Sequence, residues 1–190
     1  MANTMNAASL FLINTLFDLY LFVLVLRILL VYSGVNYFDP ITQFVVKLTD
    51  FIVKPLRRLL PTVRGFELAS IILVLVLQMI KFLLVSLLSM GMPGILGLLI
   101  LAIGDSIKIV LLTFFYAILL QAILSWAQPY SPVTRTLYQV TSPIMRPFQR
   151  LIPLINGIDI SPIPALIVLQ LLIILLVNPI MSLGLGIAFG

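Results

Sequence analysis

The sequence of 190 residues contains no cysteine and no histidine. Without cysteine there is no disulfide, no thiolate metal site and no cysteine nucleophile. Without histidine the commonest general base, metal ligand and haem ligand are also missing. Charged residues are scarce as well, at 9% of the chain, while 62% of the residues are hydrophobic. Because a soluble domain carries about 25% charged residues, this composition excludes a water-soluble globular protein and predicts an integral membrane protein.

Patterns that carry catalysis are missing too. The sequence has no P-loop, no GxGxxG, no GxSxG and no HExxH. An aspartyl protease acting inside the membrane would need two facing aspartates. Only Asp18 is expected at that depth, because Asp105 is expected at the outer start of the third span. We therefore predict that the chain is not an enzyme and binds no cofactor or metal.

Runs of about 20 predominantly apolar residues predict the membrane spans. Four such runs lie at about 10–32, 68–88, 107–126 and 163–183, which predicts an all-α polytopic membrane fold. The apolar link at residues 89–106 leaves two interpretations open: an outer hairpin after one tilted span, or a fifth short membrane segment. We prefer the hairpin, because Ser89–Gly94 breaks the helix and Ile95–Ile103 is too short to cross.

Residues 49–78 and 141–170 are two copies of one pattern, offset by 92 positions. Each copy has a basic segment with prolines, then a glycine and an acidic residue, then a long apolar run. The matched residues are Pro55, Pro61, Gly65 and Glu67 in the first copy and Pro147, Pro153, Gly157 and Asp159 in the second, where Ser161 and Pro162 follow. A repeat of this kind determines the architecture. We predict two parallel halves, residues 1–94 and 95–190, each built as helix, basic loop and helix.

Basic residues predict the orientation, because they are retained on the cytoplasmic side. Most of them lie in the two loops between the paired spans: Lys47, Lys54, Arg57, Arg58 and Arg64 in the first, and Arg135, Arg146 and Arg150 in the second. Both loops are therefore expected in the cytoplasm and both termini outside.

The loops themselves have apolar residues at helical spacing, with cations on the opposite side. Such segments lie in the membrane interface. Because of the prolines, we expect short helical pieces rather than unbroken helices. Two interpretations stay open: an anchor that fixes topology, or a docking surface for anionic lipid headgroups or a membrane-protein partner. The docking residues would be Lys54, Arg57, Arg58, Arg146 and Arg150. Nucleic-acid binding is not expected, because aromatic residues suited to base stacking do not alternate with the cations.

The glycine and acid after each basic loop have two interpretations. Asp159 or Ser161 can cap the fourth span with Pro162 in its first turn, and Glu67 can complement the dipole of the second span. Alternatively, each acid pairs with an interfacial arginine.

Few other polar groups are expected inside the membrane. Counting along the spans places Asp18 and Lys81 at similar depth, and Arg27 near Glu67. We predict both ion pairs. The Asp18–Lys81 pair would act either as a link between helices or as a proton or ion relay. Gln78 and Gln170 are expected near the midplane, as hydrogen-bonding amides between helices or as part of a substrate site.

The doubled unit, read in the second copy as TSPIMRPFQRLIPLINGIDISPI after LQAILSWA, resembles the bacterial YggT family. Its members are small inner-membrane proteins with two such modules, linked to osmotic and envelope stress tolerance. Plastid relatives are linked to cytochrome assembly and to thylakoid or nucleoid organisation. The first copy departs from the pattern, with Phe51 where the second has Pro143 and Ala69-Ser70 where it has Ser161-Pro162.

The resemblance implies a non-enzymatic accessory or scaffold protein, in stress tolerance or membrane-complex assembly. The alternative is a small solute or ion transporter or channel, with Gln78, Gln170 and Asn178 pointing into a polar path. With four spans per chain, such a pore would require a homodimer.

Overall fold

Four long apolar helices dominate the computed structural model, which describes residues 2–60, 62–63, 65–89, 91–152 and 159–190. The helical stretches Met5–Tyr32, Leu68–Ser89, Ile95–Ala127 and Pro162–Phe189 are each long and apolar enough to cross a membrane. The prediction of an all-α polytopic membrane fold is therefore confirmed.

The elements follow one another as long apolar helix, shorter helix and long apolar helix, twice. In chain order they are α1 (Ala2–Tyr32), α2 (Pro40–Arg57), the short strands β1 (Thr62–Val63) and β2 (Phe66–Glu67), α3 (Leu68–Ser89), α4 (Ile95–Ala127), α5 (Pro132–Leu151), α6 (Pro162–Leu172), the π-helical turn η1 (Ile173–Val177) and α7 (Asn178–Phe189). The strands pair antiparallel, with Thr62 opposite Glu67.

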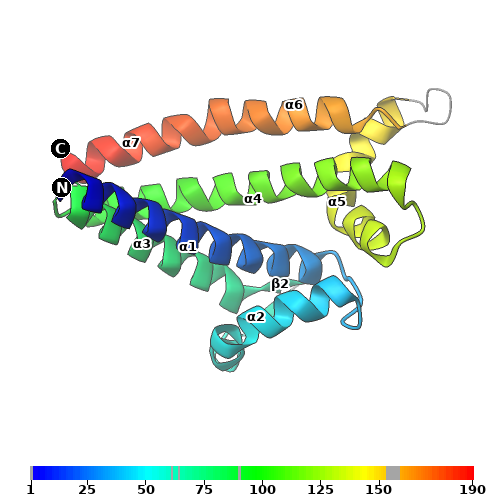
Figure 1. The fold of residues 1–190 in the computed structure, drawn as a ribbon, viewed down its shortest axis with the longest axis horizontal. Helices are drawn as coiled ribbons and strands as arrows, with labels where there is room; N and C mark the ends of the chain where they lie inside the picture. Colours follow the sequence, from blue (N-terminus) through cyan, green and yellow to red (C-terminus); the bar gives the residue numbers. More distant parts are fainter. Residues whose placement is uncertain (1, 61, 64, 90, 153–158) are drawn as a thin grey trace.

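The spans lie side by side along the long axis of the molecule (Figure 1). α1 packs on α3, α3 on α4, and α4 on α6 and α7. Both termini lie at one end of this bundle, and α2 and α5 lie at the other end (Figure 1). The two basic segments are thus on the same side of the spans, as a chain that crosses twice between them requires.

The third span starts earlier than the sequence predicts. α4 is one continuous helix from Ile95, and the helix break is confined to the turn before it, where Gly91 has a φ of 100°. Gly104 and Asp105, which suggest a helix start, are buried inside α4. No fifth segment appears among the described residues. At 1.5 Å per residue, the 33 residues of α4 span about 50 Å, longer than the roughly 30 Å of hydrocarbon, so the helix is tilted or extends past the membrane.

The fourth span contains a π turn directly before Asn178 and Pro179. The ring of Pro179 would clash with the carbonyl of residue 175 in a regular α-helix. Here the backbone N–H of Asn178 instead bonds the carbonyl of Ile173, five residues back. The wider turn therefore lets the helix continue through the proline.

α2 and α5 begin with the same kind of N-cap. Asp39 accepts from the backbone N–H groups of Ile41 and Thr42, and Ser131 accepts from that of Thr134, with a proline at the first helical position of each helix. These caps satisfy donors that a helix start leaves unpaired.

The expectation of short separate helical pieces is wrong, because both helices continue through their prolines. Pro55, Pro143 and Pro147 all lie on exposed faces, where freed carbonyls can be solvated. The carbonyl of Gln139, which Pro143 leaves without its helical donor, accepts from the Ser142 hydroxyl at 3.0 Å.

Small residues bring α4 and α7 into close contact. A Cβ added at Gly97 would lie 2.3 Å from the backbone nitrogen of Ala188, and one at Gly184 would lie 2.9 Å from the Leu101 side chain. The backbone N–H of Gly94 donates to the carbonyl of Ala188 at 2.8 Å. Close backbone approach at small residues is the usual way in which helices associate in membranes.

We expect Gly97→Ala to destabilise the chain by about 1–3 kcal/mol, because the added methyl group forces α4 and α7 apart. The matched control is Gly186→Ala, where an added Cβ meets nothing within 4 Å. Both changes gain about 1 kcal/mol of helix propensity, so their difference isolates the packing term. Unfolding in mixed detergent micelles measures it, and equal stability of the two variants would contradict the close contact.

Candidate functional site

α2 presents three distinct faces. One is buried against the bundle and consists of Thr42, Val45, Thr49 and Val53. A second carries the exposed cations Lys47, Lys54, Arg57 and Arg58. A third exposes apolar side chains: Phe44, Leu48 and Phe51. A helix with these faces packs on protein, lipid and headgroups at the same time.

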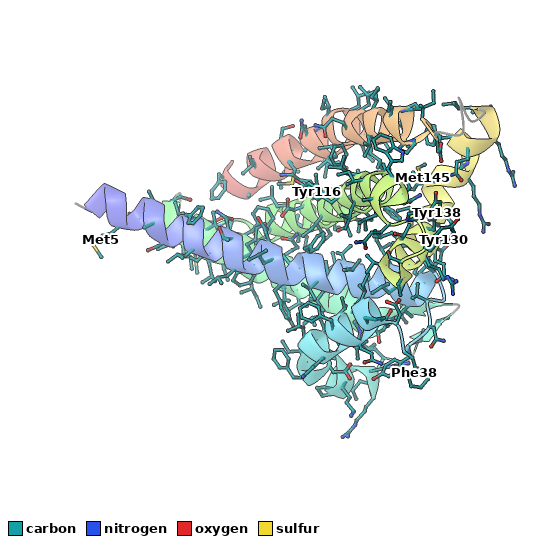
Figure 2. The ribbon with its side chains drawn as sticks, turned by 45° about the vertical axis from the view of Figure 1, so that its right-hand side comes forward. Met5, Phe38, Tyr116, Tyr130, Tyr138 and Met145 are labelled. Carbon is teal, nitrogen blue, oxygen red and sulfur yellow. The ribbon has the colours of Figure 1, made fainter. Side chains whose placement is uncertain are left out.

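α5 lies beside α2, and a hydrogen bond joins them. The Thr136 hydroxyl donates to Asp39 Oδ2 at 2.6 Å. Figure 2 shows Phe38, Tyr130 and Tyr138 at this end of the molecule, far from Met5 at the other. All five predicted docking cations are exposed here: Lys54, Arg57, Arg58, Arg146 and Arg150. We call these five residues the basic face.

Beneath α2, Arg27 is the centre of a buried ion cluster. Its Nε and Nη2 donate to the two carboxylate oxygens of Glu67 at 2.7 and 3.0 Å. Its Nη1 donates to Asp50 Oδ1 at 2.7 Å and to Thr49 Oγ1 at 2.8 Å. The structure thus brings together the predicted pair Arg27 and Glu67 and adds two partners from α2. The cluster ties α1 to α2 and to the start of α3.

Glu67 is 1% exposed and also accepts from the Ser70 hydroxyl. Burial alone would raise the pKa of this carboxyl. The hydrogen bonds from Arg27 and Ser70, with the charges of Arg27 and Arg57, outweigh burial and lower the pKa of Glu67 below its ordinary value. Glu67 is therefore a structural anion rather than a proton carrier near neutral pH.

Lys81 is the centre of a second cluster, inside the bundle. Its Nζ donates to Asp18 Oδ1 at 2.7 Å and to Asp105 Oδ2 at 2.6 Å. The structure thus brings together the predicted pair Asp18 and Lys81. The expectation that Asp105 sits at the outer start of a span is wrong, because α4 starts at Ile95 and carries Asp105 down to Lys81. One cation therefore links α1, α3 and α4.

A cleft of about 300 Å³ opens beside this cluster, lined in part by Asp18, Asp105, Lys108 and Tyr116. The Lys81 and Asp105 side chains are almost fully buried, whereas that of Asp18 is 53% exposed. Among the described residues, no group of three or more carboxylates has the spacing to hold a metal ion. The arrangement ties helices together through two carboxylates on one ammonium group.

Comparison with known proteins now identifies the family. The sequence pattern described as CCB3/YggT matches residues 6–88 and 100–180. The chain belongs to the CCB3/YggT family. It is 38% identical over 165 residues to the uncharacterized protein YggT of Escherichia coli K12, covering 85% of each chain. It is 34% identical over 178 residues to an uncharacterized protein of Pseudomonas aeruginosa, covering 92% of this chain and 90% of the relative.

A third relative, an uncharacterized Vibrio alginolyticus protein named for the region 3′ of proC, is 38% identical over 169 residues, covering 87% of this chain and 91% of the relative. No solved structure matches the chain. The predicted resemblance to the YggT family is confirmed.

Positions 92 to 94 apart in this CCB3/YggT chain make related contacts. In the first half Arg27 of α1 bonds Thr49 of α2. In the second half the Thr141 hydroxyl of α5 donates to Gln121 of α4. Both threonine hydroxyls also bond a carbonyl four residues back, on Val45 and Leu137. The hydrogen bond from the span to the following helix is thus charged in the first half, from Arg27 to Thr49, and neutral in the second, from Thr141 to Gln121.

The acids after the basic loops play different roles. Glu67 pairs with Arg27, whereas Asp159 accepts from the backbone and hydroxyl of Ser161 and from Gln149. Ser161 lies at the N-cap of α6 and Pro162 occupies its first position. Gly65 has a φ of 85°, which favours glycine at the β1–β2 turn. Pro61, Pro153 and Gly157 lie outside the described residues.

Gln78 and Gln170 do not share a role. Gln78 is fully buried and neither atom of its amide has a hydrogen-bond partner within the described structure. Gln170 and Asn178 lie on the exposed surface of the fourth span. The three side chains do not line a common path, so the arrangement expected for the transporter alternative is not found in this chain.

Four partners in the two clusters were missed by the sequence reasoning: Thr49, Asp50, Asp105 and Ser70. Thr49 had a usable signal, because a threonine recurs at position 141. Asp50 also had a usable signal, because it stands between the cations Lys47 and Lys54 on the face of α2 that reaches Arg27.

Proposed function

We propose that this CCB3/YggT chain is a non-enzymatic accessory protein of the bacterial inner membrane, which holds a partner membrane protein against its basic face. The observation that supports this most directly is the placement of α2 and α5 at one end of the bundle, joined through Thr136 and Asp39. The five exposed cations of the basic face then form one cytoplasmic surface, with both termini outside. A role in osmotic or envelope stress tolerance, through assembly of a membrane complex, fits such a surface.

The two ion clusters support a scaffold. Each one ties several elements together by hydrogen-bonded charges: α1, α2 and the start of α3 at Arg27, and α1, α3 and α4 at Lys81. Such links hold α2 in a fixed position relative to the spans. A docking surface benefits from this rigidity, because little freedom is lost on binding.

The test is complementation of a strain that lacks the gene, grown at high osmolarity. We expect the triple charge reversal of Arg58, Arg146 and Arg150 to glutamate to abolish tolerance while the protein stays in the membrane at the wild-type level. The matched control reverses Lys47 and Arg135, exposed cations outside the basic face, and should complement. Full complementation by the triple variant would contradict the proposal. So would solute flux through the purified protein in liposomes that Gln170→Ala abolishes.

A further inference from the structure

A second cleft lies between α1 and α2, at the end of the bundle opposite the termini. Its volume is about 390 Å³, in the range of small-ligand sites. The charged residues that line it are Arg27, Asp50, Lys54, Arg57 and Glu67. It is distinct from the outward part of the basic face, because Arg58 and the α5 arginines do not line it.

The cleft carries an excess of one positive charge, since three cations face two carboxylates. Lys54 has no ion-pair partner in the part of the chain that the structure describes, and Arg57 lies 3.9 Å from Glu67. Of the five N–H donors on a guanidinium, Arg27 uses four on Glu67, Asp50 and Thr49. A ligand with one negative charge and several acceptor oxygens would neutralise this excess charge. Its oxygens would accept hydrogen bonds from the cations that line the cleft.

A buried hydroxyl in the cleft is unpaired among the residues that the structure describes. Thr42 lines the cleft and is 6% exposed, and its Oγ1 makes no hydrogen bond with any of them. A buried donor left unpaired costs about 1–3 kcal/mol, so a ligand oxygen is the partner to expect. The corresponding residue of the second half, Thr134, donates to the Gln128 carbonyl at 2.8 Å. The unsatisfied donor is thus a property of the first half.

The remaining wall of the cleft is apolar. Leu30, Val31, Val35 and Val46 line the same cleft as the cations. A ligand with a charged head and an apolar body satisfies both walls, whereas free phosphate would leave the apolar wall uncovered.

We propose that this cleft binds the phosphodiester head of one anionic glycerophospholipid. Lys54, Arg57 and the Thr42 hydroxyl donate to the phosphate oxygens, and the acyl chains follow the apolar wall into the membrane. The second half has no equivalent, because Gln121 and Gln149 stand where the first half has Arg27 and Arg57. The site goes beyond the proposed docking function and stands whether or not a protein partner binds.

Native mass spectrometry of the purified full-length protein, with phosphatidylglycerol and phosphatidylcholine of matched chains, tests the site. The wild type should retain one phosphatidylglycerol per chain in preference to phosphatidylcholine. The double variant K54Q/R57Q should bind it about 30-fold more weakly, from two lost cation contacts. Thr42→Val, which keeps every charge, should bind about fivefold more weakly, from one lost hydrogen bond.

The matched control is K47Q/R135Q, which removes the same charge from exposed positions outside both the cleft and the basic face and should retain the lipid as the wild type does. Glycerol phosphate without acyl chains should bind far more weakly than the lipid. Equal retention of the two lipids by the wild type, or unchanged binding in both cleft variants, would overturn the proposal. Equally tight binding of glycerol phosphate would also overturn it, since the site would then recognise a soluble anion.

Discussion

Replacing Lys81 with methionine is expected to destabilise the chain by about 3–5 kcal/mol, because Asp18 and Asp105 lose the cation with which both are paired. Methionine keeps the volume and the apolar stem of the lysine, so packing is little changed. The cost comes from Asp105, which is 8% exposed and would be left with an uncompensated charge. Unfolding in mixed detergent micelles, followed by circular dichroism, measures the loss.

The double variant K81M/D105N separates charge from packing. It removes the buried carboxylate together with its partner and leaves only Asp18, whose side chain is 53% exposed. We expect the double variant to be more stable than K81M, although it carries one more substitution. If K81M were as stable as the wild type, or if the second substitution brought no recovery, the three-residue cluster would not hold these helices together.

Asp105 also shows why hydropathy alone did not predict where the third span begins. The four spans could be predicted because each is a long apolar run, and hydrocarbon thickness sets the length that a run needs. The start of α4 could not, because Gly104 and Asp105 resemble the polar end of a span. In the structure they are buried by contacts on α7 and α3, namely Met181 against Gly104 and Lys81 on Asp105. Contacts of this kind depend on how helices rotate against one another, which depth along a single helix does not determine.

Among the candidate site residues, the ion pairs could be predicted from the sequence and the roles of the amides could not. Both predicted ion pairs could be found because charges at equal depth inside a membrane seek each other. The amides could not be assigned by the same reasoning. Gln78 and Gln170 are matched by sequence, but one is fully buried and the other exposed, because α3 is packed between α1 and α4 whereas α6 has one helical span beside it. Residues that the sequence repeat matches therefore lie in different surroundings in the two halves.

Glu67→Gln is expected to cost about 3 kcal/mol at neutral pH, since it removes charge-assisted hydrogen bonds from Arg27 to a buried carboxylate. Arg27 keeps Asp50 and Thr49 as partners, so its charge is not left alone. Arg27→Gln, which copies the residue found at position 121, should cost more, about 3–5 kcal/mol, because it leaves Glu67 buried with only Arg57 at 3.9 Å.

The pH dependence distinguishes this ion pair from a general packing effect. Because the pKa of Glu67 is lower in the folded chain than its unfolded value of about 4.5, the unfolded state takes up the proton first as the pH falls. The stability from the pair is therefore present in full above about pH 4.5 and is lost as the pH falls through the lower folded value. The stability difference between wild type and Glu67→Gln should be constant near neutral pH and shrink below pH 4.5. A difference that stays the same down to pH 3 would mean that Glu67 contributes through its shape and not through its charge.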